Sequence, residues 1–169
     1  FTMLEFYQAY ADYRDAMDFT EVLLRQLACE VVGREQIEWQ GEAIDLAPAF
    51  RRVSVREAVI EHNPALGTEV DDPAALARHA ESLGIAIQPQ WGTGKILLEV
   101  FEKTAESALI QPTFVTDYPV EVSPLARPRD DDPTVTERFE LIVAGREIAN
   151  GFSELNDAED QARRFRRQA

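Results

Sequence analysis

The side chains of this sequence that could do chemistry are mostly acids, and several gather near its C-terminal end. Glu140, Glu147 and Glu154 lie there with the amide of Asn150 among them. Carboxylates at this density favour a divalent cation or a cationic ligand. The same stretch contains no Ser/His or Cys/His pair.

A β-hairpin would position two of these acids. Residues 137–143 and 146–152 have the character of strands, and Ala144-Gly145 between them fits a two-residue turn. That hairpin would lead into a helix start, because Asn156-Asp157 is a typical N-cap signal.

In this register Glu140 faces Ala149, and Glu140 and Glu147 share one face about 7–8 Å apart. Two carboxylates this close require a proton or a cation between them. Mg²⁺ suits them when the partner is a polyphosphate, because it binds carboxylate and phosphate oxygens together. The alternative is a pair of solvated acids on an exposed sheet face, and strand parity does not decide between the two.

Parity places Asn150, Phe152 and Glu154 on the face opposite Glu147. An interior strand glycine often marks a bulge, and Gly151 therefore indicates a bulge near residues 149–151. A bulge there would bring all four side chains to one side.

Composition limits the class of protein. The chain has 169 residues with 45% hydrophobic content, enough for one domain with a core. Its net charge of −14 argues against nucleic-acid binding by this chain alone. The single cysteine, Cys29, excludes an internal disulfide and fits a reducing compartment, so we expect a cytoplasmic protein. No apolar run approaches about 20 residues, and we expect no membrane span.

Residues 1–7 alternate as a strand, with Phe1, Met3, Glu5 and Tyr7 on one face. A carboxylate between Met and Tyr either has a cationic or hydrogen-bonding partner or lies in water on an edge strand. The pattern leaves both open.

The remaining pattern predicts helices and a second hairpin. Residues 92–95, Gly-Thr-Gly-Lys, partly match a phosphate-binding loop. The match fails because Pro89 occupies the position of the first glycine and Ile96 that of the Ser or Thr. The predicted elements are helices over residues 15–32, after Ser54, from Pro73, over 95–109 and over 158–167, a hairpin turning at Gln40-Gly41, and extended segments over 113–118 and 120–126.

Several long stretches resemble class II lysyl-tRNA synthetases. They are residues 1–13 (FTMLEFYQAYADY), 112–114 with 121–126 (PTF and EVSPLA), and 137–140 followed by 145–157 (ERFE and GREIANGFSELND). The resemblance covers essentially the whole chain but not the whole enzyme, because the anticodon-binding barrel, motif 1, the motif 2 arginine and motif 3 have no counterpart in it. We therefore expect an internal segment of a catalytic domain that is inactive when isolated.

The resemblance implies an α+β fold, an antiparallel sheet flanked by helices. One partial catalytic domain would span residues 1–169. Within it, residues 1–47 would hold the second strand of motif 2, a helix and a hairpin. Residues 48–111 would form a helical insertion, and residues 112–169 the active-site strands and the following helix.

The implied activity is ATP-dependent activation of L-lysine to lysyl-adenylate and transfer to tRNA(Lys), with Mg²⁺ as cofactor. The full-length protein would be a homodimer. The implied roles are adenine contact by Phe1 and Met3, Mg²⁺ and ATP binding by Glu140 and Glu147, and lysine binding by Glu5, Tyr7, Asn150, Phe152 and Glu154.

Two other functions fit the sequence. A synthetase-like paralogue would ligate a lysine-type residue to a protein, and a non-catalytic acidic α+β module would serve folding or partner binding. The intact residues 150–154 and the tyrosines of residues 7–13 favour the tRNA enzyme, and flanking sequence would separate the three.

Overall fold

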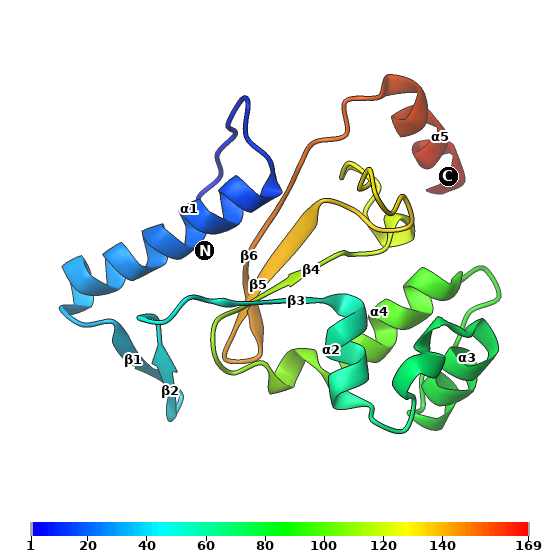
Figure 1. The fold of residues 1–169 in the computed structure, drawn as a ribbon, viewed down its shortest axis with the longest axis horizontal. Coiled ribbons are helices and arrows are strands. Elements are labelled where there is room, and N and C mark those ends of the chain that lie inside the picture. Colours follow the sequence, from blue (N-terminus) through cyan, green and yellow to red (C-terminus); the bar gives the residue numbers. More distant parts are fainter. Residues whose placement is uncertain (1, 169) are drawn as a thin grey trace.

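A four-stranded sheet lies at the centre of the molecule (Figure 1). The computed structural model describes residues 2–168, with side chains described for 2–166. The strands, in their order across the sheet, are β3 (Arg51–Ser54), β4 (Thr113–Thr116), β5 (Arg138–Val143) and β6 (Arg146–Phe152). The α+β class is confirmed. The sheet is mixed rather than purely antiparallel, since β3 runs parallel to β4 and a helical crossover joins them.

Helix α1 (Tyr13–Leu27) and a small hairpin of β1 (Gln36–Trp39) and β2 (Glu42–Asp45) lie on one side of this sheet (Figure 1). The helix begins two residues earlier than predicted, because Asp12 caps it in a reciprocal capping box. A short π-helical turn, Ala28–Val32, continues it to Gly33, where the predicted end is confirmed by a left-handed φ of 79°.

Three helices cover the other face: α2 (Val55–His62), α3 (Pro73–Ser82) and α4 (Thr93–Thr104). The predicted starts of α2 and α3 are confirmed by side-chain caps from Ser54 and Asp72. The 3₁₀ turns of this part of the chain are Gly67–Asp71 and Glu106–Ala108.

Successive side chains of the strands point to opposite faces of the sheet, so the sheet contributes to two apolar cores. The core under α2, α3 and α4 includes Val53, Val115 and Ile142. The core under α1 includes Phe114, whose ring meets that of Phe139 edge-on at 5.3 Å. The sheet is therefore held from both sides, which fixes the face on which each strand residue lies.

The strand predicted over residues 1–7 is wrong for its described part. Residues 2–7 form no strand, and their side chains are exposed. Phe1 lies outside the described residues. A strand persists only when its backbone groups pair with a neighbour, and among the described residues no backbone hydrogen bond joins 2–11 to another segment.

Residues 120–126 were predicted to be extended, but they begin with a 3₁₀ turn, Val120–Val122. The final helix, α5 (Ala158–Gln168), is anchored to this segment by Arg164, which is only 7% exposed. Its guanidinium donates to the carbonyls of Ser123 and Ala126 at 3.3 and 3.0 Å and pairs with Asp160. Acceptors on two segments satisfy the donors of the Arg164 guanidinium, which explains why this charged side chain can be buried.

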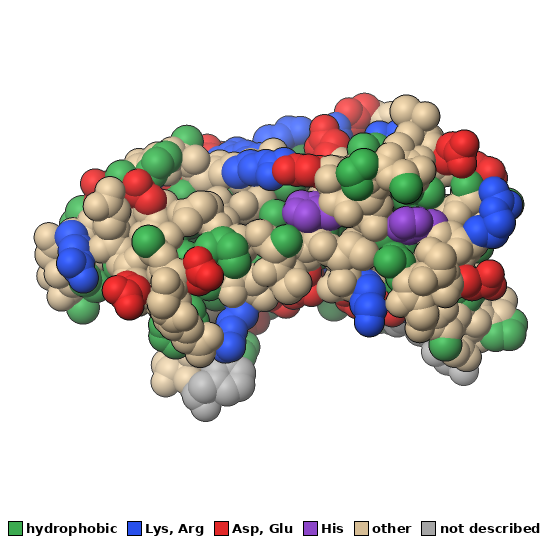
Figure 2. Space-filling view, turned by 90° about the horizontal axis from the view of Figure 1, so that it is seen from below, with side chains coloured by type: hydrophobic (Ala, Val, Ile, Leu, Met, Phe, Trp, Pro, Cys, Tyr) green, Lys and Arg blue, Asp and Glu red, His purple; other side chains and the backbone are tan. Residues whose placement is uncertain are grey.

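The surface shown in Figure 2 carries acidic and basic side chains interspersed, with no continuous basic patch. The two histidines also show on this face. Each makes a hydrogen bond within the layer formed by α2, α3 and α4, called the helical layer below. His62 bonds to the carbonyl of Ala58, and His79 bonds to the side chain of Asn63. In the described part of the chain, no helix is both long and apolar enough to span a bilayer.

Candidate active site

The β5–β6 hairpin has the predicted turn. Ala144 and Gly145 adopt φ values of 52° and 67°, the left-handed pair of a type I′ turn. Beyond it Ile142 pairs with Glu147 as predicted, but the register then shifts, and Glu140 pairs with Asn150 instead of Ala149.

The bulge that causes this shift lies at Ile148, before the predicted position at residues 149–151. Its effect is the one expected of a single extra residue. Glu147, Asn150 and Phe152 now lie opposite Ile142, Glu140 and Arg138, which alternate along one face of β5. The amide of Asn150 donates to Oε1 of Glu147 at 3.2 Å, so the two side chains meet on that face.

Gly151 has a different role from the one predicted. It pairs with Phe139, and a Cβ at this position would lie 2.7 Å from the Phe139 ring. The glycine therefore makes room for an aromatic ring of the core under α1, on the face opposite the acids.

Glu140 is the most enclosed of the predicted metal ligands, with 14% of its side chain exposed. Burial raises its pKa, the nearby charge of Glu147 adds to the rise, and two donors oppose it. These donors are the hydroxyl of Tyr118, at 2.7 Å from Oε2, and the guanidinium of Arg138 at Oε1. Arg138 also lies over the Tyr118 ring, 4.6 Å from its centre. The carboxylate is thus oriented by contacts on both oxygens.

The end of the helical layer adds further negative charge beside this pair. Partial burial raises the pKa of Glu106, and the charges of Glu102, Glu140 and Glu147 raise it further. Four carboxylates therefore share one region in which a cation would relieve their repulsion.

The donor set fits Mg²⁺ in one particular way. Among the described residues no group of three or more His, Cys, Asp or Glu side chains is arranged to hold a metal ion by itself. Mg²⁺ bound together with a nucleotide needs only one or two protein carboxylates, because phosphate oxygens and water complete its octahedron. Glu140 and Glu147 suit that shared mode.

A second acidic group lies beyond the end of β6. The hydroxyl of Tyr7 donates to Glu5 at 3.0 Å. The pKa of Tyr7 is raised first by this bond and by the charge of Glu5, and the charge of Glu154 contributes as well. Glu154 is fixed by a backbone bridge to Ala126. Tyr7 thus contacts Glu5 directly and feels the charge of Glu154, which is far from it in sequence, and all three side chains are exposed.

Comparison with known proteins identifies the family to which this arrangement belongs. All of residues 1–169 match the family model described as "tRNA synthetases class II (D, K and N)". The chain belongs to this family of class II synthetases.

Curated relatives in this family are named "Lysine--tRNA ligase". The protein of Xanthomonas campestris pv. campestris (strain 8004) is 57% identical over 169 residues, and that of Thioalkalivibrio sulfidiphilus (strain HL-EbGR7) is 55% identical over the same length. Each match covers 99% of this chain and 34% of the relative. The chain thus spans about a third of the length of these ligases.

Within this class II synthetase domain, the predicted site residues fall into two groups, one on β5 and β6 and one that includes Glu154, just beyond the end of β6. Glu140, Glu147 and Asn150 form the first, and Phe152 follows on the same face. Glu5, Tyr7 and Glu154 form the second. Met3 is 72% exposed, so it is not enclosed by either group, and Phe1 lies outside the described residues.

Sequence reasoning missed the residues that orient Glu140. Arg138 precedes Glu140 by two positions, and same-face strand spacing could have indicated the pair. Tyr118 carried no such signal, because the ring reaches Glu140 from a loop after a different strand.

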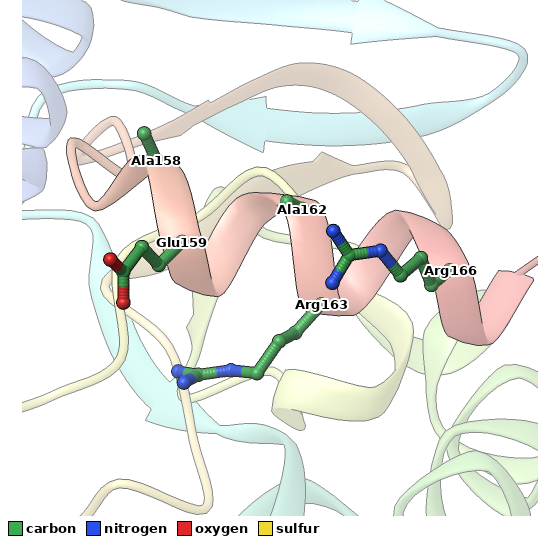
Figure 3. A pocket seen from close by; sticks show the side chains of 5 residues that line it. All are labelled: Ala158, Glu159, Ala162, Arg163 and Arg166. Carbon is green, nitrogen blue, oxygen red and sulfur yellow. The ribbon is translucent and has the colours of Figure 1, made fainter.

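Two hollows in the surface are lined by other parts of the chain. One, of about 400 Å³, is lined by residues of α5 alone, and Figure 3 shows their side chains spread along this helix. The other, of about 390 Å³, lies where residues 45–51 meet residues 111–112. Neither contains a predicted site residue. The residues lining the first are Ala158, Glu159, Ala162, Arg163 and Arg166.

Proposed function

We propose that this chain is the central part of a lysine–tRNA ligase, which activates L-lysine with ATP and transfers it to tRNA(Lys). The full-length gene product acts in the cytoplasm as a homodimer. The names of the curated relatives support the choice of amino acid and acceptor. The observation that carries the proposal is the acidic pair Glu140 and Glu147 on the β5–β6 hairpin, with a second acidic group that includes Glu154 beyond the end of β6.

The group formed by Glu5, Tyr7 and Glu154 suits the ammonium groups of lysine. Its carboxylates repel acidic ligands and leave neutral ones unable to satisfy them, which favours a cationic amino acid. Asn150 offers an amide to the substrate, and Phe152 offers an apolar wall for the aliphatic stem. Met3 and Phe1 would contact the adenine.

The group formed by Glu140 and Glu147 suits the phosphate end of ATP. When bound, Mg²⁺ supplies positive charge that neutralises the phosphate oxygens during attack by the lysine carboxylate. Tyr118 and Arg138 hold Glu140 in one orientation, and Asn150 bonds to Glu147. The protein thus contributes positioning and electrostatics, with no protein nucleophile.

The test is ATP–pyrophosphate exchange by the full-length gene product with lysine, arginine or ornithine as the amino acid. Exchange with lysine, and much weaker exchange with the other two, is expected. Calorimetry with the same three amino acids, with and without ATP, measures their binding directly. Equal use of all three, or no exchange with lysine, rejects the proposal. Adenylate formation without charging of tRNA(Lys) would favour the protein-ligating alternative.

A further inference from the structure

The turn of the β5–β6 hairpin is fastened to the end of the helical layer. The amide of Ala144 donates to the carbonyl of Ile110 at 2.8 Å, and the amide of Gly145 donates to that of Leu109 at 3.0 Å. These bonds join the strands that carry Glu140 and Glu147 to a segment that ends the crossover between β3 and β4.

Gly145 also touches the backbone of this segment. A Cβ on Gly145 would lie 2.8 Å from the carbonyl oxygen of Ser107 and 3.1 Å from its Cα. The opposing atoms belong to the main chain, so they cannot move aside by a rotamer change. Any side chain at position 145 would push the turn away from residues 107–110.

Helix α4, which precedes this segment, is anchored at its N-terminal end as well. Glu121 accepts hydrogen bonds from the amides of Gly92 and Lys95, at 2.7 and 3.2 Å, and so caps α4. A Cβ on Gly92 or Gly94 would crowd this carboxylate. Residues 92–95, whose sequence partly resembles a phosphate loop, therefore bind an internal carboxylate. These hydrogen bonds hold the start of α4 to the segment that contains Glu121.

We infer that Gly145 is a positioning residue for the pair Glu140 and Glu147. Its close contact with residues 107–110, at the end of the helical layer, fixes the position of Glu147. Only Arg146 separates Gly145 from Glu147, whereas Glu154 lies beyond the opposite end of β6 and is held there by its bridge to Ala126. A displaced turn therefore shifts Glu147 relative to Glu140 and leaves Glu154 in place. This inference rests on the proposed function, because it assumes that Glu140 and Glu147 hold the metal.

The experiment compares matched glycines in the full-length gene product. Gly41 also occupies the second position of a two-residue hairpin turn, with φ 88°, but its Cβ would meet nothing within 4 Å. Gly41→Ala therefore imposes the same left-handed backbone cost without the contact. Gly145→Ala adds the contact, and Gly145→Asn does so with a residue that tolerates left-handed φ.

Two quantities are measured: the Mg²⁺ concentration for half-maximal lysine-dependent exchange, and the Mg²⁺ concentration for half-maximal ATP binding in calorimetry. Both Gly145 variants are expected to raise the two concentrations about tenfold, with a smaller change in the KM for lysine, and Gly41→Ala is expected to leave both concentrations unchanged. The inference is overturned if the Gly145 variants keep the wild-type Mg²⁺ requirement, if Gly41→Ala raises it equally, or if neither Gly145 variant folds. Absence of exchange in the unmodified protein would instead reject the proposed function.

Discussion

The hydroxyl of Tyr118 donates a 2.7 Å hydrogen bond to Glu140, while the ring of Tyr118 is enclosed in the core under α2, α3 and α4. One side chain therefore belongs both to this apolar core, through its ring, and to the acidic site, through its hydroxyl. Burial raises the pKa of Glu140, and this bond lowers it toward the ordinary carboxyl range.

Tyr118→Phe should move the acid limb of the exchange activity to higher pH. Without the hydroxyl, the pKa of Glu140 rises further, and the carboxylate that binds the cation forms only at higher pH. A pH profile of exchange measures the shift. Tyr13→Phe removes a hydroxyl on the other face of the sheet and serves as the control. An unchanged acid limb in Tyr118→Phe would contradict the role given to this bond.

The same variant should lose about 2 kcal/mol of stability at neutral pH, the usual contribution of a hydrogen bond to a charged group. The pKa of Glu140 is raised in the folded protein, so Glu140 stabilises the fold when protonated, and this contribution is lost as pH rises through its folded pKa. The deficit of Tyr118→Phe should therefore shrink near pH 4. Urea unfolding at the two pH values provides the comparison.

Glu147→Gln should lower lysine-dependent exchange by about a hundredfold, because the amide lacks the charge that a divalent cation requires. Glu147 is exposed, so stability should change by no more than about 0.5 kcal/mol. Glu42→Gln removes an exposed carboxylate of the β1–β2 hairpin and should leave exchange unaffected. Wild-type exchange in Glu147→Gln would remove this residue from the metal site.

Glu154→Ala should raise the KM for lysine by tenfold to about a hundredfold, the cost of losing a charged hydrogen-bond partner. The KM for ATP should change little, since Glu154 lies in the group formed with Glu5 and Tyr7. Glu159→Ala, at an exposed position on α5, is the control. Equal rises in the two constants would exclude a specific contact with the substrate ammonium.

Gly151→Ala should destabilise the fold by about 1–3 kcal/mol, because the new methyl group overlaps the Phe139 ring. Thermal or urea unfolding measures the loss. The Phe139→Leu background removes the ring atoms, so Gly151→Ala should cost less there. Equal costs in both backgrounds would show that the overlap is not the cause.

Local signals predicted much of this fold. The caps at Ser54 and Asp72 and the turns at Gln40-Gly41 and Ala144-Gly145 depend on neighbouring residues, and each forms as predicted. The strand predicted over residues 1–7 is absent over residues 2–7, because a strand also needs a pairing partner, which its own residues cannot specify.

The site was predicted only in part for a related reason. The sequence indicated that a bulge would gather the side chains around Glu147, but Gly151 misplaced it, because that glycine accommodates the Phe139 ring from the adjacent strand. Tyr118 and Glu121 act across long sequence separations, and no local spacing encodes such contacts.

Because β3 and β4 are parallel, the crossover leaves the sheet after Ser54 and re-enters it at Thr113, beside Arg51 at the opposite end of β3. The closure entropy of a connection between two fixed ends changes slowly with its length, by about 0.6 kcal/mol for each doubling. Synthetases of this family could therefore gain or lose residues between α2 and α4 without disturbing the strands. The part that cannot be shortened is the stretch from Ser107 to Ile110, where the hairpin turn rests.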